Sequence, residues 1–109
     1  TSLMRPAADN LSELVMQKSF SAPEIPVLHN VHAKTEEDPE KIKSLMLEQI
    51  YQPVLWVDCV NALSSRGAEI LIECGPGRVL NGLSKRIDRA LTSLATDDVA
   101  SLENALTSV

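Results

Sequence analysis

Apolar residues in the first half of the chain recur at helical spacing in three places. The spacing predicts a helix over residues 6–18, a second that starts at Pro39, and a third that starts at Pro53 and ends at Gly67. Proline suits the first turn of a helix, and glycine suits the position just after the last turn. The apolar positions that mark the three faces are Leu11, Leu14, Val15, Ile42, Leu45, Met46, Ile50, Val54, Val57, Val60 and Leu63.

Between the first two helices the pattern changes. The stretch PVLHNV (26–31) is short and apolar, and it predicts a buried strand. The stretch KTEEDPEK (34–41) predicts a solvated loop, in which Asp38 caps the helix that follows.

The second half of the chain predicts two more strands. AEILIE (68–73) is apolar almost throughout, as in a parallel sheet covered on both faces. The glycines of residues 75–77 then turn the chain into a helix over 78–91, and residues 92–95 form a last short strand.

A closing helix, capped by Asp97 or Asp98, follows with its apolar residues facing inward: Val99, Leu102, Ala105 and Leu106. Strands that alternate with helices predict an α/β fold with a mostly parallel sheet. Such a thin sheet, and a chain that opens at Thr1 without Met, lead us to expect partner strands elsewhere in a longer protein.

Composition and charge narrow the class of function. The chain has 109 residues, 44% hydrophobic and 23% charged, which is ordinary for one globular domain. The net charge of -5 and the presence of only three aromatic residues argue against nucleic-acid binding. No run is long and apolar enough to span a membrane, and none resembles a signal peptide. We therefore expect a reducing, cytoplasmic setting, with no membrane partner.

The stretch ECGPGRVLNGL (73–83) allows two interpretations. A glycine-rich turn that leads into a helix can border an active site or hold an anion at the free N–H groups of the helix. A tight structural turn is the simpler expectation, because the spacing matches neither GxGxxG nor a P-loop. We expect the stretch to end a strand and begin the next helix, and not to be a phosphate loop by itself.

The helix after this turn carries a concentrated basic face. Arg78, Lys85 and Arg89 share one side, Arg86 lies beside them, and the opposite side is apolar: Val79, Leu80, Leu83, Ile87 and Leu91. On an acidic chain, such a face suggests an anionic cofactor or an acidic protein partner. A solvated helix face is the alternative.

Other candidates for chemistry are sparse. His29 and His32 would point to opposite faces of a strand, so we expect no metal site and no bound cofactor. Cys74 could be a thiolate at a helix N-terminus, but a small buried residue is the simpler expectation. No G-x-S-x-G motif occurs, so the chain holds no complete nucleophile, base and orienting group.

Five stretches, in register along the whole chain, carry a family resemblance. They are LMRPAAD (3–9), FSAPEIPVLHNV (20–31), QIYQPVLWVDCV (49–60), ECGPGRVLNGLSKRI (73–87) and SLENAL (101–106). On these stretches the chain resembles the C-terminal third of malonyl-CoA:acyl carrier protein transacylases, the loading enzymes of bacterial fatty-acid synthesis. Acyltransferase domains of polyketide synthases share the same landmarks.

The resemblance implies a fold. Residues 1–109 would be the C-terminal part of an α/β-hydrolase-like large subdomain, a parallel sheet flanked by helices. This part would follow a ferredoxin-like insertion that the chain does not contain. The N-terminal remainder of the same enzyme would then be a partner of this chain.

The resemblance also implies a reaction and roles for residues. A serine takes the malonyl group from malonyl-CoA and passes it to the phosphopantetheine thiol of acyl carrier protein, with a histidine as base. The serine would lie outside this chain, and the histidine would directly precede Thr1, so the chain alone would be inactive. The backbone carbonyl of Gln49 would orient that histidine, and Asn30 would lie near the site. The basic residues Arg78, Lys85, Arg86 and Arg89 would meet the acidic carrier protein.

A second hypothesis is that the protein binds a partner and is not itself an enzyme. The basic helix and the missing nucleophile also fit a stand-alone module that binds a carrier protein or coenzyme A. That module would be stable and monodisperse by itself. A piece of a larger enzyme would instead expose apolar surface.

Overall fold

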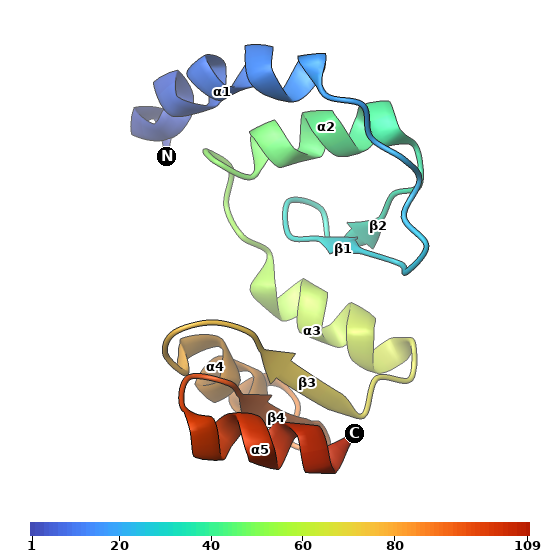
Figure 1. Cartoon of the computed structure of the whole chain (residues 1–109), viewed down its shortest axis with the longest axis vertical. Helices are drawn as coiled ribbons and strands as arrows, with labels where there is room; N and C mark the ends of the chain where they lie inside the picture. Colours follow the sequence, from blue (N-terminus) through green and yellow to red (C-terminus); the bar gives the residue numbers. More distant parts are fainter. The chain divides into compact units, whose positions relative to one another are not determined.

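The computed structural model describes all 109 residues. It divides into two compact units, Thr1–Cys59 and Val60–Val109, and the division falls within helix α3 (Trp56–Ser65). Each unit has its own secondary structure (Figure 1) and is described by itself.

Two helices that pack against each other dominate the first unit. After a 3-10 turn (Ser2–Met4), α1 (Arg5–Gln17) lies beside α2 (Pro39–Glu48) (Figure 1). The Asp38 side chain accepts a hydrogen bond from the Glu40 N–H at 3.0 Å. The cap at Asp38, with proline in the first turn, is therefore confirmed.

The predicted strand over 26–31 is only partly correct. β1 (Leu28–His29) is two residues long and pairs antiparallel with β2 (Lys34–Thr35), inside the segment predicted to be a loop. Ala33, with φ of 53°, reverses the chain between them. The segment therefore pairs with itself in a separate two-stranded sheet and does not join the parallel one.

Helix α3 begins at Trp56, three residues later than the prediction from Pro53. Its end agrees with the prediction, because Gly67 takes φ of 88° and donates its N–H to the Ser64 carbonyl at 2.9 Å. Val60 on this helix is completely buried.

The second unit contains the parallel pair that the pattern predicted. β3 (Ile70–Glu73) and β4 (Thr92–Ala95) run parallel, with Ile70 opposite Thr92 and Glu73 opposite Ala95. Helices α4 (Val79–Ile87) and α5 (Val99–Ser108) both pack against this sheet (Figure 1). The alternation of strand and helix makes the chain an α/β protein.

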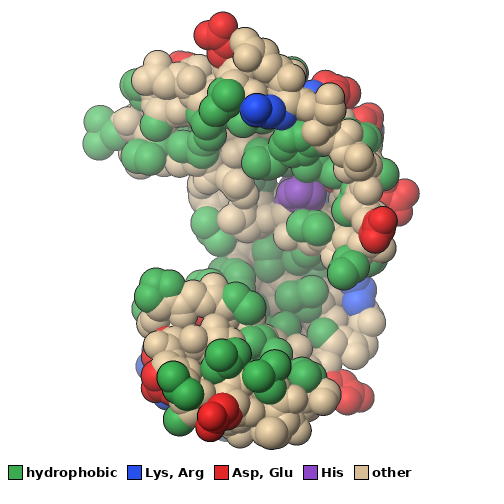
Figure 2. All heavy atoms as spheres, viewed as in Figure 1, with side chains coloured by type: hydrophobic (Ala, Val, Ile, Leu, Met, Phe, Trp, Pro, Cys, Tyr) green, Lys and Arg blue, Asp and Glu red, His purple; other side chains and the backbone are tan.

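The buried residues of these two helices are small or polar, and the inward face predicted for α5 is only partly correct. On α4 the buried residues are Asn81 and Ser84, whereas Val79 is 72% exposed and Leu80 and Leu83 are also exposed. On α5 only Ala105 is buried, and three predicted core residues are exposed: Val99, Leu102 and Leu106. Hydrophobic side chains therefore lie on the surface of the protein (Figure 2).

None of the helices combines the length and the apolar character needed to cross a bilayer.

Candidate functional site

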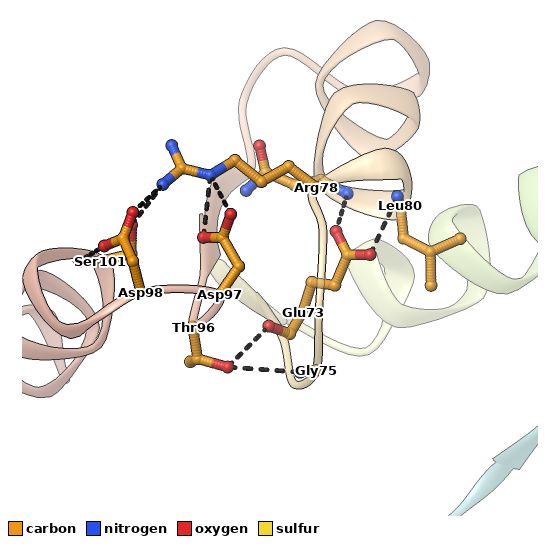
Figure 3. Close-up of polar contacts among 9 residues, drawn as sticks. Glu73, Gly75, Arg78, Leu80, Thr96, Asp97, Asp98 and Ser101 are labelled. Atoms are coloured by element: carbon orange, nitrogen blue, oxygen red, sulfur yellow. Dashed lines mark hydrogen bonds and ion pairs between the residues drawn. The ribbon is translucent and has the colours of Figure 1, made fainter.

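The glycine turn after β3 is closed by a carboxylate of the protein itself. Glu73, the last residue of β3, accepts hydrogen bonds from the N–H groups of Leu80 at 3.3 Å and Asn81 at 2.7 Å (Figure 3). These are N–H groups of the first turn of α4, where an external anion would have to bind. Gly75 and Gly77, with φ of 141° and 87°, allow the tight return. The interpretation of this turn as an anion site is therefore wrong.

Thr96 joins the ends of the two strands. Its hydroxyl donates to the Glu73 carbonyl at 3.2 Å and accepts from the Gly75 N–H at 3.4 Å (Figure 3). The carboxyl ends of β3 and β4 and the start of α4 are thus held in one hydrogen-bonded frame.

Arg78 is bound to acidic residues of the same unit. Its Nε lies 2.9 and 2.8 Å from the two carboxylate oxygens of Asp97, and its Nη2 donates to Asp98 at 2.9 Å and to Ser101 at 2.6 Å (Figure 3). Hydrogen bonds to Asp97 raise the pKa of Arg78, and the guanidinium lowers the pKa of Asp97. The pKa of Asp98 is lowered mainly by its hydrogen bonds from Ser101. Arg78 therefore braces the start of α5 and is not a free cation.

The end of α4 decides which other basic residues belong to the helix. The predicted helix to residue 91 is too long, because α4 ends at Ile87 and Arg89 lies beyond it. Asp88 stops the helix: its carboxylate accepts from the Ser64 hydroxyl at 2.7 Å and from the Ala90 N–H at 2.9 Å, and both bonds lower its pKa. Lys85 and Arg86 remain in the last turn of α4, exposed and without an ion pair.

Gln49 occupies the end of α2 in the first unit. It is exposed, and its N–H donates to the Leu45 carbonyl at 3.0 Å. Two residues later, the Tyr51 carbonyl accepts from the nitrogen of Thr1 at 2.6 Å. The Arg5 guanidinium also lies 4.5 Å from the centre of the Tyr51 ring. The beginning of the chain is thus held against the turn that contains Gln49.

Asn30 connects β1 to the segment before α3. Its carbonyl accepts from the Leu55 N–H at 2.9 Å. Its side-chain Oδ1 is buried without a hydrogen-bond partner, as are His29 Nε2 and Trp56 Nε1. Buried polar atoms in a native fold usually have partners, so this segment has unused hydrogen-bonding capacity.

The two histidines lie together, contrary to the prediction of opposite faces. Their ring centroids are 5.9 Å apart and nearly perpendicular, because His32 falls in the turn after β1 and not in a strand. Burial lowers the pKa of His29, and His32 lowers it further. No group of three His, Cys, Asp or Glu side chains in the structure could hold a metal ion.

The cysteines also depart from expectation. Cys74 is exposed, so the interpretation as a small buried residue is wrong. Cys59 is the buried cysteine, and burial raises the pKa of its thiol.

Two features escaped the sequence analysis. Glu73 reads as the end of an apolar strand, and nothing in the pattern reveals that its carboxylate caps α4. A groove of about 370 Å³ also opens between α1 and α2, lined by residues that include Arg5, Asp9, Glu48 and Tyr51. The sequence holds one hint of this groove. Arg5 and Asp9 are four residues apart, so both charged side chains lie on the same face of a helix.

Comparisons with known proteins agree over nearly the whole chain. The malonyl CoA-acyl carrier protein transacylase of Salmonella typhimurium is 45% identical over 105 residues, which are 96% of this chain and 34% of that protein. The chain spans about a third of the length of the curated relatives it matches. No protein-family model matches it.

Solved structures agree in fold as well as in sequence. An acyl carrier protein S-malonyltransferase from Vibrio cholerae superposes with a TM-score of 0.86 at 49% identity, over 95% of this chain and 34% of that one. A malonyl-transacylase in complex with a type II PKS acyl-carrier protein superposes with a TM-score of 0.88 at 42% identity, over 98% of this chain and 35% of that one. The chain is therefore similar to malonyl CoA-acyl carrier protein transacylases along nearly its whole length, and it corresponds to about a third of the length of these relatives.

Proposed function

We propose that residues 1–109 form the C-terminal part of the large subdomain of an enzyme that transfers a malonyl group from malonyl-CoA to acyl carrier protein. The observation that carries this proposal is the similarity to named transacylases over 95% or more of the chain. The parallel pair β3–β4 would belong to a larger α/β-hydrolase-like sheet. The exposed apolar residues of α4 and α5 support this, because they would pack against the N-terminal remainder of the enzyme.

The reaction needs no cofactor or metal ion. A serine hydroxyl attacks the malonyl thioester, a histidine takes the serine proton, and the coenzyme A sulfur leaves and receives that proton. The thiol of the carrier protein then gives its proton to the histidine and attacks the malonyl-serine ester, and the histidine passes that proton to the leaving serine oxygen. The resemblance puts the serine outside this chain and the histidine directly before Thr1. Fatty-acid synthesis of this kind would take place in the cytoplasm.

Gln49 would orient the histidine through its backbone carbonyl. The contact between Arg5 and Tyr51 supports this role, since it holds the first residues of α1 near the turn of residues 49–51. A carbonyl that accepts from one imidazole N–H leaves the other ring nitrogen free to act as base. The role requires the backbone of Gln49 and not its side chain.

Asn30 would lie beside the same site. Its hydrogen bond to Leu55 brings β1 to the segment that follows the Gln49 turn. The unpartnered Asn30 Oδ1 could accept a hydrogen bond from a group outside this chain.

Lys85, Arg86 and Arg89 would meet the carrier protein. The first two lie at the C-terminal end of α4, exposed and without ion pairs, and Arg89 follows two residues after the helix. Arg78 would support this face from its place between Asp97 and Asp98 and would not itself contact the partner. Exposed cations of this kind raise the rate of encounter with an acidic protein.

The test is a transfer assay with the intact protein from its natural gene. It is mixed with malonyl-CoA and acyl carrier protein, and the carrier mass is followed by mass spectrometry. The proposal predicts a carrier protein heavier by one malonyl group, with a malonyl-enzyme intermediate when the carrier is left out. A protein that binds the carrier but never transfers the acyl group would support the non-catalytic binding module instead.

A further inference from the structure

A polar cavity lies beside β4 in the second unit. It has a volume of about 140 Å³ and lies between residues of α4, residues 93–95 of β4, and residues of α5. Its side-chain lining includes Arg78, Asn81, Lys85, Ser101 and Asn104. No acidic residue lines it, although the chain has a net charge of -5.

Residues 93–95 of β4 form one wall of this cavity. The Thr92 N–H donates toward β3, to the Glu69 carbonyl at 2.9 Å. Because the groups of a parallel strand alternate in direction, the N–H and C=O groups of Ser93 and Ala95 both point away from β3. Any anion in the cavity would have to bind the N–H groups beside these carbonyls.

The side chains add one free charge and several donors. Lys85 has no acidic partner within ion-pair distance. Asn81 and Ser93 are more than nine-tenths buried, so the polar wall is built into the fold. The Ser101 hydroxyl is already engaged, because it accepts from Arg78 at 2.6 Å and its hydrogen bond to Asp98 lowers the pKa of that carboxyl.

We propose that this cavity binds a single small oxyanion, a phosphate or a carboxylate group, with Lys85 as its counter-charge. An ammonium, amide N–H groups and hydroxyls are the donors that oxyanions require, and charge-assisted bonds are the strong ones. A cavity of roughly 150 Å³ holds a benzene molecule, so the space suits one oxyanion and excludes a nucleotide.

The test is a titration of the intact protein with inorganic phosphate, and separately with acetate, at constant ionic strength, followed by backbone amide NMR. We expect saturable shifts of the Ser93 and Ala95 amides, and the stronger of the two anions identifies the preferred group. Lys85→Gln should weaken binding about tenfold, as expected for one charge-assisted contact. Asn104→Asp, which adds a negative charge at an exposed position of the lining, should abolish it.

Arg86→Gln is the matched control, since Arg86 carries the same charge on the same turn but does not line the cavity. It should change the affinity by less than about twofold, the range of an exposed charge that makes no contact. Equal weakening by Lys85→Gln and Arg86→Gln, or shifts that do not saturate, would overturn the proposal. No carrier protein is present in this experiment, so its failure would leave the acyl-transfer function untouched.

Discussion

The Glu73 carboxylate accepts a hydrogen bond from the Asn81 N–H at 2.7 Å and so caps helix α4 from the end of the preceding strand. An acidic side chain at this position also interacts favourably with the positive end of the helix dipole. The Glu73 carboxylate thus occupies N–H groups of the first turn of α4 that an external anion would otherwise use.

Glu73→Ala should lower the free energy of unfolding by about 1 kcal/mol, the usual cost of a lost N-terminal helix cap. Chemical denaturation followed by circular dichroism measures the change. Glu69→Ala is the control, because Glu69 is exposed one residue before β3 and uses only its backbone carbonyl. Equal effects of the two substitutions would show that the cap contributes nothing.

Substitution by alanine should have opposite effects on the stability of the protein at Gly77 and at Gly82. Gly77 has φ of 87°, so Gly77→Ala should destabilise the protein by about 1–2 kcal/mol through backbone strain. Gly82 lies inside α4, and nothing lies within 4 Å of a Cβ built there, so Gly82→Ala should stabilise the protein by about 0.5–1 kcal/mol. Thermal unfolding of both variants measures the signs. Destabilisation by Gly82→Ala would contradict the observation that a Cβ at position 82 has free space around it.

The stability of the protein should fall as the pH is lowered through the range of histidine titration. Burial lowers the pKa of His29 below its usual 6.5, so the folded state holds His29 neutral. Below pH 6.5 the unfolded state therefore binds more protons than the folded state, and stability decreases with decreasing pH.

The free energy of unfolding measured between neutral and mildly acidic pH tests this. His29→Asn removes the titrating group and should flatten the pH dependence. An unchanged slope in the variant would contradict this role of His29.

Gln49→Ala should leave the rate of malonyl transfer within about twofold of the wild type, since the proposed contact uses a backbone carbonyl that alanine also provides. The value of kcat/KM for malonyl-CoA, measured with the intact protein, is the readout. A loss of tenfold or more, about 1.4 kcal/mol of transition-state stabilisation, would instead assign the role to the amide side chain.

Much of the fold could be predicted because local signals agreed with one another. Asp38 before a proline marked the start of α2, and Gly67 marked the end of α3, each through a backbone preference that needs no tertiary contact. The parallel pair followed from the apolar runs at 68–73 and 92–95, with the helix between them. The five stretches that carry the family resemblance were likewise readable, since they are continuous in the sequence.

The errors arose where a distant contact decides the outcome. Spacing placed Arg78 and Arg89 on one helix face. Arg78 instead forms ion pairs with Asp97 and Asp98. The helix ends at Ile87, before Arg89. The apolar residues of α5 were expected to face inward, yet only Ala105 is buried. A periodic pattern identifies a face but not the element that covers it.

Charge reversal on α4 tests the central claim most directly. In the intact protein, Lys85→Glu with Arg86→Glu should slow malonyl transfer to acyl carrier protein by at least about tenfold, because the acidic partner is now repelled, while transfer to a small thiol stays within about twofold. Lys18→Glu with Lys41→Glu changes the net charge equally at exposed positions of the first unit and should slow neither reaction. If the charge reversal on α4 changes the rates of transfer to the carrier protein and to the small thiol by the same factor, the proposed role of this face is wrong.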